Sequence, residues 1–488
     1  MENLSSKFAS RVERKVKVLQ FGEGNFLRAF VDYMIDAAND AGVFDGNIAI
    51  VKPISYGNLD NFRKQENFYT VSLRGKEEGE VKQINKIVTS VSDVVGAIEE
   101  YERYSEYAKA EDLRFIISNT TEAGIVYHEN DKFELTPPET FPGKLTKLLY
   151  ERFTYFNGDT NKGLVMIPCE LIENNGKNLQ DCVLKFATHW NLGEDFITWI
   201  KEACVFCSTL VDRIVTGYPK DEPELFENLG YKDDLLVTGE IFGLWVIESD
   251  KDISAELPLD KAGLPVIFTD DQRPYRERKV RILNGAHTSF VLASYLAGND
   301  YVLESMQDEP VRKFMYETIH EEIIPTLSLP KEELVSFADS VVERFENPYI
   351  KHALLSISLN SVSKWKSRCL PSFKGYVEKF KKLPTNLSFS LAALIGFYSG
   401  GDLKDGALTG YRGEESYKIL DDEFVLRFFE ENVSKSKEDL VSLCLSNKAF
   451  WGMDLSEYEG LSSLITDYLI EIEESGMREV IVRLSGKK

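Results

Sequence analysis

The sequence predicts an α/β protein with a parallel sheet in its N-terminal half and a mainly helical C-terminal half. An apolar segment at Val16–Gly22 is followed by a glycine-containing turn and then by the helical apolar spacing of Phe26–Ala38. Three more apolar segments, at 48–53, 114–119 and 163–169, end in polar loops. Beyond about residue 178 the apolar residues recur with the period of helices.

Composition and charge exclude several classes of function. The chain has 488 residues, enough for two or three domains. Its 57 Lys and Arg against 80 Asp and Glu give a formal net charge of −23, which repels nucleic-acid backbones and anionic lipid. No segment approaches the ~20 consecutive apolar residues of a membrane span, and the N-terminus lacks an apolar signal core. We therefore expect a cytoplasmic protein with no nucleic-acid or membrane partner and no obligate protein partner.

The cysteines and histidines predict no metal site. The six cysteines show no paired framework of the secreted kind. Cys204 and Cys207 form a C-x-x-C pair, but no second pair or paired histidines completes a zinc site, which favours a structural role for both thiols. Since the five histidines are scattered along the chain, we expect metal-free chemistry.

The turn between the first strand and the first helix, Gly22-Glu23-Gly24-Asn25, predicts a Rossmann-type dinucleotide-binding unit. A backbone without side chains can approach a pyrophosphate closely, and the following helix N-terminus favours negative charge. The G-x-G-x-x-G pattern is incomplete, because Leu27 stands where the third glycine would be. A plain turn is therefore the alternative interpretation.

The end of the second strand leaves the choice between NAD and NADP open. In this position an acidic residue normally binds the adenosine ribose. Here the strand ends in Lys52, Pro53, Ile54 and Ser55, and the nearest acidic residue is Asp60.

Strand-like segments near 236–238 and 265–269 interrupt the helical pattern of the second half. A loop rich in proline and acidic residues, 217–224, is the expected neighbourhood of a change of domain. We place a Rossmann-type domain at residues 1–238 and a mainly helical domain at residues 239–488.

The segment 279–288 contains an amine, an amide and an imidazole that can act on one oxygen. On an α-helix, Lys279 and His287 are ~80° apart and Asn284 lies ~60° beyond His287, so all three project into one sector. A lysine with a lowered pKa can act as a general base, and an amide can donate to an alkoxide or carbonyl oxygen. This set suits proton transfer at a carbinol. The alternative is a surface lysine beside a core histidine.

Five motifs resemble those of the mannitol dehydrogenase family of long-chain polyol dehydrogenases, and the resemblance runs from about residue 15 to beyond residue 370. In chain order they are GEGNFLRAF (22–30), SNTTEAG (118–124), IPCELIENNG (167–176), FCSTLVDRIVTG (206–217) and KVRILNGAH (279–287). The resemblance implies an N-terminal Rossmann-type domain, a helical C-terminal domain, and metal-independent hydride transfer between NAD(H) and a sugar acid in the cleft between them.

Within the family, the motifs most resemble the branch that reduces D-tagaturonate to D-altronate in hexuronate catabolism. The sequence has Ala29-Phe30 after Arg28, whereas the broader family pattern G-x-G-x-F-x-R-x-H has a histidine; we expect this departure in that branch.

The resemblance also implies roles for individual residues. In the family pattern K-x4-N-x2-H, Lys279 is the general acid/base, Asn284 helps to form the oxyanion hole and His287 orients the reacting oxygen. A second oxyanion-hole residue is Asn175, and Asp212 is expected to tune the lysine. The expected cofactor contacts come from the first two motifs and the strand end before them: Phe21, Gly22, Gly24, Asn25, Phe26, Asn119, Thr120 and Glu122.

A sugar-acid substrate requires a cation for its carboxylate, and arginine suits this by bidentate pairing. Lys364, Lys366 and Arg368 form one candidate cluster, and Arg213 is another candidate. The alternative for the cluster is a solvated basic face.

Two other functions compete with reduction of tagaturonate. A mannonate (fructuronate) or hexitol dehydrogenase of the same family would share the catalytic residues. A regulatory protein that senses NAD without catalysis would be expected to carry a basic DNA-reading helix, but this chain is acidic and keeps the Lys279, Asn284 and His287 set.

Overall fold

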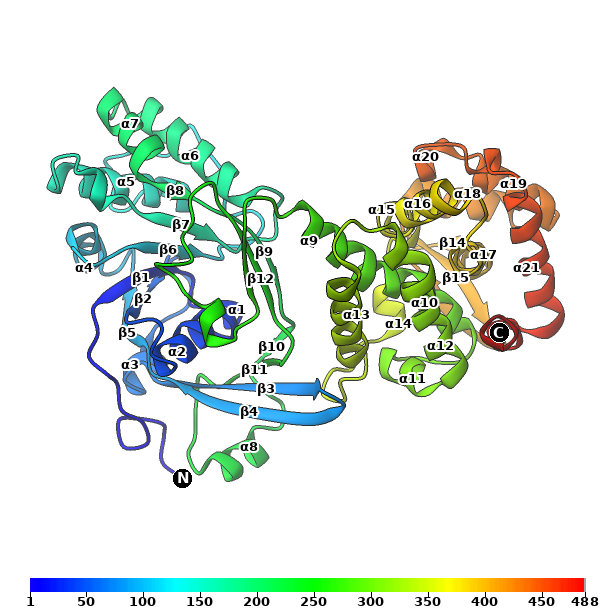
Figure 1. Cartoon of the computed structure of the whole chain (residues 1–488), viewed down its shortest axis with the longest axis horizontal. Helices are drawn as coiled ribbons and strands as arrows, with labels where there is room; N and C mark the ends of the chain where they lie inside the picture. Colours follow the sequence, from blue (N-terminus) through cyan, green and yellow to red (C-terminus); the bar gives the residue numbers. More distant parts are fainter. Residues whose placement is uncertain (487–488) are drawn as a thin grey trace. The chain divides into compact units, whose positions relative to one another are not determined.

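The computed structural model describes residues 1–486, which divide into two compact units. Unit 1 consists of Met1–Gly75 and Lys82–Gln272, and unit 2 consists of Lys76–Val81 and the chain from Arg273 onward. Figure 1 shows the elements of both units in chain order. No helix among the described residues is both long enough and apolar enough to span a bilayer.

The central sheet of unit 1 is parallel and has the strand order β5-β2-β1-β6-β7-β8. This is the 3-2-1-4-5-6 order of the doubly wound dinucleotide-binding fold, so the predicted α/β fold class is confirmed. The strands are β1 (Val16–Phe21), β2 (Asn47–Lys52), β5 (Val91–Gly96), β6 (Phe115–Ser118), β7 (Val165–Pro168) and β8 (Val205–Phe206).

Apolar layers cover both faces of this sheet, which explains why its strands are apolar without alternation. Val18 packs in one core with Phe30 of the first helical segment, whereas Leu19 and Phe21 pack in the other core with α5. The helices of unit 1 are α1 (Asn25–Leu27), α2 (Tyr33–Asp40), α3 (Asp60–Lys64), α4 (Tyr101–Ser105), α5 (Phe141–Tyr155), α6 (Asn175–His189), α7 (Glu194–Ala203) and α8 (Glu222–Leu229).

Two smaller sheets complete unit 1 and move its boundary beyond residue 238. One has the order β10-β11-β3-β4, and the other has the order β13-β12-β9. Residue 238 lies inside β11, and β12 pairs with β9, which places Trp245 and Ile247 in the N-terminal core. Residues 239–272 therefore belong to unit 1. The strands are β3 (Tyr69–Glu77), β4 (Glu80–Val88), β9 (Ser208–Asp212), β10 (Val215–Gly217), β11 (Val237–Glu240), β12 (Leu244–Glu248) and β13 (Val266–Thr269).

Unit 2 is mainly helical and has one small antiparallel sheet. The helices are α9 (Arg273–Arg278), α10 (Gly285–Leu296), α11 (Val302–Gln307), α12 (Glu309–Glu317), α13 (Lys331–Phe345), α14 (Leu354–Ile357), α15 (Ser361–Arg368), α16 (Leu370–Phe380), α17 (Thr385–Tyr398), α18 (Glu423–Asn432), α19 (Lys437–Leu445), α20 (Lys448–Trp451), α21 (Leu461–Ser475) and α22 (Met477–Gly486). The sheet contains β14 (Leu403–Lys404), β15 (Ala407–Arg412) and β16 (Glu415–Ile419).

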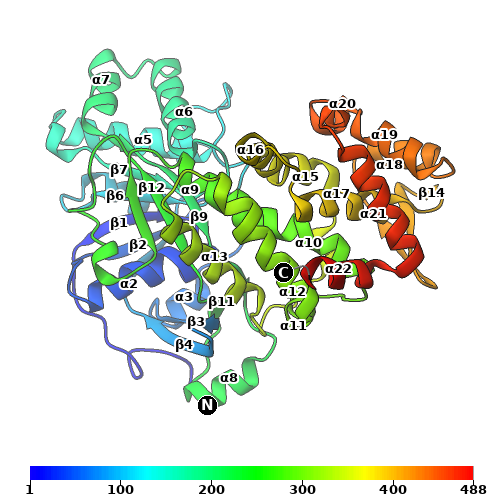
Figure 2. The same cartoon turned by 45° about the vertical axis from the view of Figure 1, so that its right-hand side comes forward.

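Helix α17 forms the centre of unit 2 because it is apolar on nearly all sides. It packs against α10 and α21, and α10 and α17 lie side by side in both views (Figures 1 and 2). Its first turn is bound by the buried carboxyl group of Glu322, which accepts the backbone N–H groups of Asn386 and Leu387, each at 2.8 Å. Burial raises the pKa of Glu322 to about 7, although these backbone hydrogen bonds oppose the shift.

The raised pKa of Glu322 predicts a pH-dependent stability. Because the folded state favours the protonated carboxyl, this stabilisation is present below the ordinary pKa near 4.5 and is lost as the pH rises through 7. We expect Glu322→Gln, which cannot ionise, to gain stability relative to the parent protein by about 3 kcal/mol between pH 4.5 and pH 8. Thermal unfolding of both proteins across this range measures the difference. A difference that does not change with pH would show that Glu322 titrates normally.

Candidate active site

The turn after β1 is shaped for close approach of a ligand to the backbone. Gly22 has φ +119°, a conformation that L side chains rarely adopt, and a Cβ there would lie 3.1 Å from the backbone oxygen of Asn119. Gly24 is exposed, and a Cβ there would meet nothing within 4 Å. Gly24 also precedes a continuous helical segment, 25–40, whose N-terminus has no side-chain cap. This arrangement fits a pyrophosphate group.

The buried guanidinium group of Arg28 stabilises the glycine turn through hydrogen bonds. Its Nε donates to the backbone oxygen of Glu23 at 3.2 Å, one terminal nitrogen donates to Asn25 Oδ1 at 2.6 Å, and the other donates to the backbone oxygen of Leu235. Phe26, a predicted cofactor contact, stacks on Phe30 with 5.0 Å between ring centroids. Phe30 occupies the position where the broader family pattern has a histidine. Its side chain is fully buried, and this environment suits an apolar residue.

Two of the other predicted cofactor contacts are fixed by neighbouring loops. The side-chain amide of Asn119, just after β6, donates to the backbone oxygen of Cys169 at 2.8 Å. The backbone N–H and the hydroxyl of Thr120 both donate to Glu170 Oε1 at 2.9 Å. Because Glu170 is buried, the pKa of its carboxyl is raised, while the bonds from Thr120 and Ser118 oppose this. The loops after β6 and β7 are thus tied together at the carboxyl edge of the sheet.

Phe21 and Glu122, the remaining two predicted cofactor contacts, differ in the exposure of their side chains. The side chain of Phe21 is fully buried in the core, where it contacts Tyr104 and Phe141, so only its backbone lies at the turn. Glu122 is exposed in the loop after β6.

Asn175 was predicted to help form the oxyanion hole, but its side chain makes a different set of contacts. It is buried at the start of α6, and its amide nitrogen donates to the backbone oxygens of Pro168, Glu170 and Thr209 at 3.0–3.2 Å. Its Oδ1 accepts the backbone N–H groups of Gly176 and Thr209, each at 2.8 Å. Because backbone groups occupy both ends of the carboxamide, this geometry favours a structural role that joins β7, α6 and β9.

Backbone oxygens occupy the guanidinium group of Arg213, a predicted candidate for the carboxylate site. Its buried guanidinium group donates to the backbone oxygens of Ala29, Phe242 and Ile241, and it lies over the rings of Phe30 and Tyr33. Burial lowers its pKa to about 10. These contacts favour a structural role for Arg213 in unit 1.

Asp212, the neighbour of Arg213, is half-buried at the end of β9, where it pairs with Leu244 in the sheet register. Its expected action on Lys279 stays a prediction.

Lys279, the predicted general acid/base, lies in unit 2 at the start of a π-helical turn, η5 (Lys279–Asn284). This turn leads into α10. A helix with i→i+5 hydrogen bonds has roughly 4.4 residues per turn, so Lys279 and Asn284 are only about 50° apart. A regular α-helix would set them ~140° apart. His287 follows within one turn of α10, ~60° from Asn284. The π-helical turn therefore brings the three residues closer together than the predicted α-helix would.

Asn284 and His287 have unused hydrogen-bonding capacity. Within residues 1–486, no protein group pairs with the carboxamide of Asn284, which is half-buried. His287 stacks on Phe345 with 4.2 Å between ring centroids, and its buried Nε2 has no hydrogen-bond partner in this part of the chain. Both groups can bind a substrate oxygen, because a buried polar group without a partner is costly.

Four basic side chains surround His287: Arg344 on α13, His352 before α14, and Lys364 and Arg368 on α15. Burial lowers the pKa of His287 well below 6.5, and the four neighbours lower it further, so the imidazole is neutral at pH 7. The ring centroids of His287 and His352 lie 5.4 Å apart. We call these four residues the basic cluster.

Arg368 is the member of the basic cluster best suited to bind an anion. Its side chain is partly buried, burial lowers its pKa, and no described residue forms a hydrogen bond or an ion pair with its guanidinium group. Lys364 lies one helical turn earlier and donates to the backbone oxygen of Ile357 at 2.8 Å. Lys366 is exposed, and a position two residues away points to the opposite side of α15. The predicted cluster thus contributes two residues, Lys364 and Arg368.

Sequence reasoning missed Arg344 and His352. His352 follows a short segment without helical period, and Arg344 is one of many charged residues on an amphipathic helix. No sequence signal distinguishes either residue from a surface charge.

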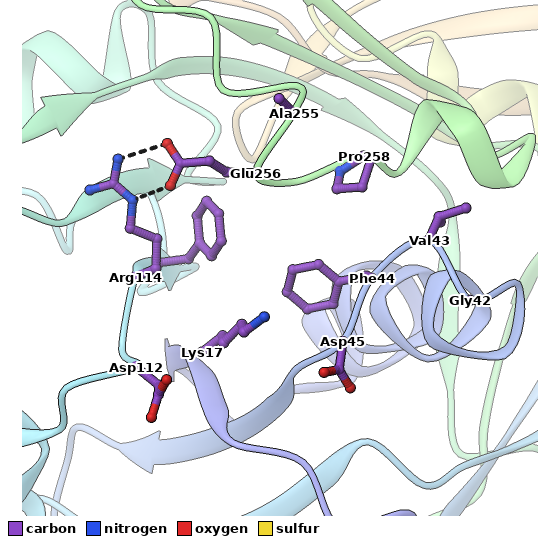
Figure 3. A pocket seen from close by; sticks show the side chains of 11 residues that line it. Lys17, Gly42, Val43, Phe44, Asp45, Asp112, Arg114, Ala255, Glu256 and Pro258 are labelled. Carbon is purple, nitrogen blue, oxygen red and sulfur yellow. Dashed lines mark hydrogen bonds and ion pairs between the residues drawn. The ribbon is translucent and has the colours of Figure 1, made fainter.

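A separate pocket of about 390 Å³ lies in unit 1 at the start of β1 and β6 (Figure 3). Lys17, Phe44 and Asp112 contribute to its lining, and Arg114 pairs with Glu256 through two hydrogen bonds. Because the glycine turn follows the opposite ends of the strands, this pocket is not part of the dinucleotide site. Across residues 1–486 no three His, Cys, Asp or Glu side chains form a group that could hold a metal ion.

The strand order, the open glycine turn and the uncapped helix N-terminus define a Rossmann-type dinucleotide-binding unit, joined here to a helical unit. Residues 16–261 match the mannitol dehydrogenase Rossmann domain, and residues 271–473 match the mannitol dehydrogenase C-terminal domain. The chain belongs to the mannitol dehydrogenase family, as its motifs predicted.

Full-length relatives and solved structures agree with this assignment. The chain is 44% identical to an altronate oxidoreductase of Shigella flexneri and 43% identical to one of Escherichia coli O7:K1, with 99% of both chains covered in each case. A crystal structure of D-sorbitol dehydrogenase matches with a TM-score of 0.78 at 20% identity, over 99% of this chain and 100% of that one. The Pseudomonas fluorescens mannitol 2-dehydrogenase complex with NAD and D-mannitol matches with a TM-score of 0.65 at 21% identity, over 100% of both chains.

Proposed function

We propose that this protein is an NAD-dependent oxidoreductase that reduces D-tagaturonate to D-altronate, a reversible reaction of hexuronate catabolism. The name shared by relatives 43–44% identical over the full length carries this proposal. Mannonate and hexitol dehydrogenase activities are not favoured, because these relatives are named for altronate. We also propose that the enzyme works in the cytoplasm, where NADH is available.

Unit 1 is proposed to bind the dinucleotide. The backbone of Gly22 and Gly24 and the start of the helix at Asn25 would hold the pyrophosphate, and Asn119 and Thr120 would border the remainder. When bound, the nicotinamide ring supplies the hydride for reduction and accepts it for oxidation. The loops bound by Arg28 and Glu170 keep these contacts in place.

Unit 2 is proposed to stabilise the negative charge on the reacting oxygen and to transfer a proton to and from it. As the carbonyl carbon is reduced, negative charge develops on its oxygen, and the side-chain amide of Asn284, which has no partner within residues 1–486, donates to it. The Lys279 ammonium then gives its proton to that oxygen, and in the oxidative direction the neutral amine removes it. His287 is neutral, so its imidazole can hydrogen-bond the same oxygen without adding charge.

The basic cluster is proposed to bind the substrate carboxylate. In a chain with a formal net charge of −23, four basic side chains gather beside His287, and Arg368 has no hydrogen-bond or ion-pair partner among residues 1–486. A guanidinium group pairs with a carboxylate through two parallel hydrogen bonds. A neutral ketose would leave this charge unpaired, so the cluster favours a sugar acid.

An NADH-consumption assay with tagaturonate, fructuronate and fructose tests the proposal. We expect kcat/KM for tagaturonate to exceed that for fructose by at least about 10³-fold, because a charged partner is missing from the ketose. Comparable turnover of fructose would contradict the sugar-acid assignment. A clear preference for fructuronate would keep the reaction class and change the substrate.

A further inference from the structure

The ends of β2 and β5 hold an ion pair that the sequence did not reveal. Lys52, the last residue of β2, donates from Nζ to Glu99 Oε1 at 2.7 Å and to the backbone oxygen of Ile54 at 2.7 Å. Glu99 lies three residues beyond the end of β5, in a loop pinned to β2 by the bond from the Ala97 N–H to the backbone oxygen of Lys52, 3.0 Å. The pair thus lies at the carboxyl edge of the sheet.

The two partners differ in exposure. The Lys52 side chain is 3% exposed, whereas that of Glu99 is 47% exposed. A ligand that reaches this edge therefore meets the carboxylate, and the ammonium is covered. The hydrogen bond from the Lys52 ammonium lowers the pKa of Glu99, which keeps this carboxylate ionised at pH 7.

The surrounding charges make this edge unfavourable for a further anion. Glu23 of the glycine turn interacts electrostatically with both Lys52 and Glu99. A second cation near this edge, Arg63 on α3, is paired with Glu100 at 2.6 Å. Each cation here is matched by a carboxylate, so neither is available for a phosphate.

We propose that Glu99 is the residue that selects NAD over NADP in this enzyme. The inference rests on the proposed dehydrogenase function. At the end of the second strand of such folds, a carboxylate binds the ribose 2′-hydroxyl of NAD and repels the 2′-phosphate of NADP. Position 52 carries a lysine, and Glu99, from the loop that follows the neighbouring strand β5, both neutralises it and supplies the missing carboxylate.

Titration of the protein with NADH and with NADPH, followed by dinucleotide fluorescence without substrate, tests this role. We expect the parent protein to bind NADH more tightly. In Glu99→Ala the Lys52 ammonium is uncovered, so the ratio of Kd for NADPH to Kd for NADH should fall by at least about tenfold, the worth of one charge-assisted hydrogen bond. Glu99→Gln, which keeps the shape and loses the charge, should give an intermediate ratio.

Two further variants distinguish the cause. In the double variant Glu99→Ala/Lys52→Met, the affinity for NADPH that Glu99→Ala gained over the parent protein should be lost, because the Lys52 ammonium is no longer there to pair with the 2′-phosphate. Glu106→Ala is the matched control, since Glu106 is an exposed carboxylate paired with Lys109 at 2.6 Å. It should leave the ratio unchanged.

The outcomes separate this inference from the proposed function. An unchanged ratio in Glu99→Ala would overturn the role of Glu99 and leave the proposed function intact. A parent protein that prefers NADPH would overturn the role of Glu99 and the choice of NAD, and would leave the reduction of tagaturonate as proposed. A parent protein that binds neither dinucleotide would overturn both.

Discussion

Replacement of Lys279 by alanine is expected to lower kcat for tagaturonate reduction by about 10³-fold or more, with less than about a twofold change in the Kd for NADH. General acid catalysis by a positioned side chain is worth about 10²–10⁴-fold, and in Lys279→Ala the oxygen also loses a nearby positive charge. NADH affinity should persist, because every residue assigned to the dinucleotide lies in unit 1 and Lys279 lies in unit 2. Steady-state kinetics and fluorescence titration measure the two quantities.

The matched control is Lys374→Ala, which removes an exposed lysine on α16. This variant should retain parental kcat and stability. Loss of NADH binding in parallel with activity in Lys279→Ala would show that the lysine supports the fold and does not act on the substrate oxygen.

The second large effect is expected at Arg368. Replacing it with leucine should raise KM for tagaturonate by about 10–100-fold, since a hydrogen bond to a charged group is worth about 1.5–3 kcal/mol. The KM for fructose should barely change, because fructose has no carboxylate to pair. The preference for the acid, measured as the ratio of kcat/KM values, should therefore decrease with little change in kcat.

Lys366→Met is the control for this experiment, because Lys366 lies on the same helix, α15, but is exposed. It should leave the preference unchanged. If Arg368→Leu behaved like the parent protein, the carboxylate would have to bind elsewhere in the basic cluster, at Lys364, Arg344 or His352.

The sequence was a good guide to the strands and a poor guide to the domain boundary. The apolar segments at 16–22, 48–53, 114–119 and 163–169 all contain strands of one parallel sheet, because burial on both faces leaves a continuous apolar signal. The boundary at residue 238 instead falls within β11. Pairing of β12 with β9 is a long-range contact, and no local pattern reports it.

For the candidate site, sequence identified residue types but not whether their hydrogen bonds are already used. Asn175 and Asn284 look alike in a motif, yet backbone groups surround the first, and no described protein group pairs with the amide of the second. Arg213 and Arg368 differ in the same way. The partner of Lys52 was missed because Glu99 lies 47 residues further on, at the end of a neighbouring strand.

The π-helical turn at Lys279–Asn284 accommodates one more residue between the lysine and the amide than an α-helix could place there on the same face. Relative to an α-helix, such a turn contains one additional residue per hydrogen-bonded loop. Deleting any one residue from 280–283 would allow an uninterrupted α-helix, which is no less stable as a helix. Asn284 and His287 would then follow Lys279 by four and seven positions, ~40° to one side of it and ~20° to the other, so the three side chains would still share one face. An α-helix that kept every residue would instead set Lys279 and Asn284 ~140° apart, so the π-helical turn is what allows a segment of this length to present the three groups on one face.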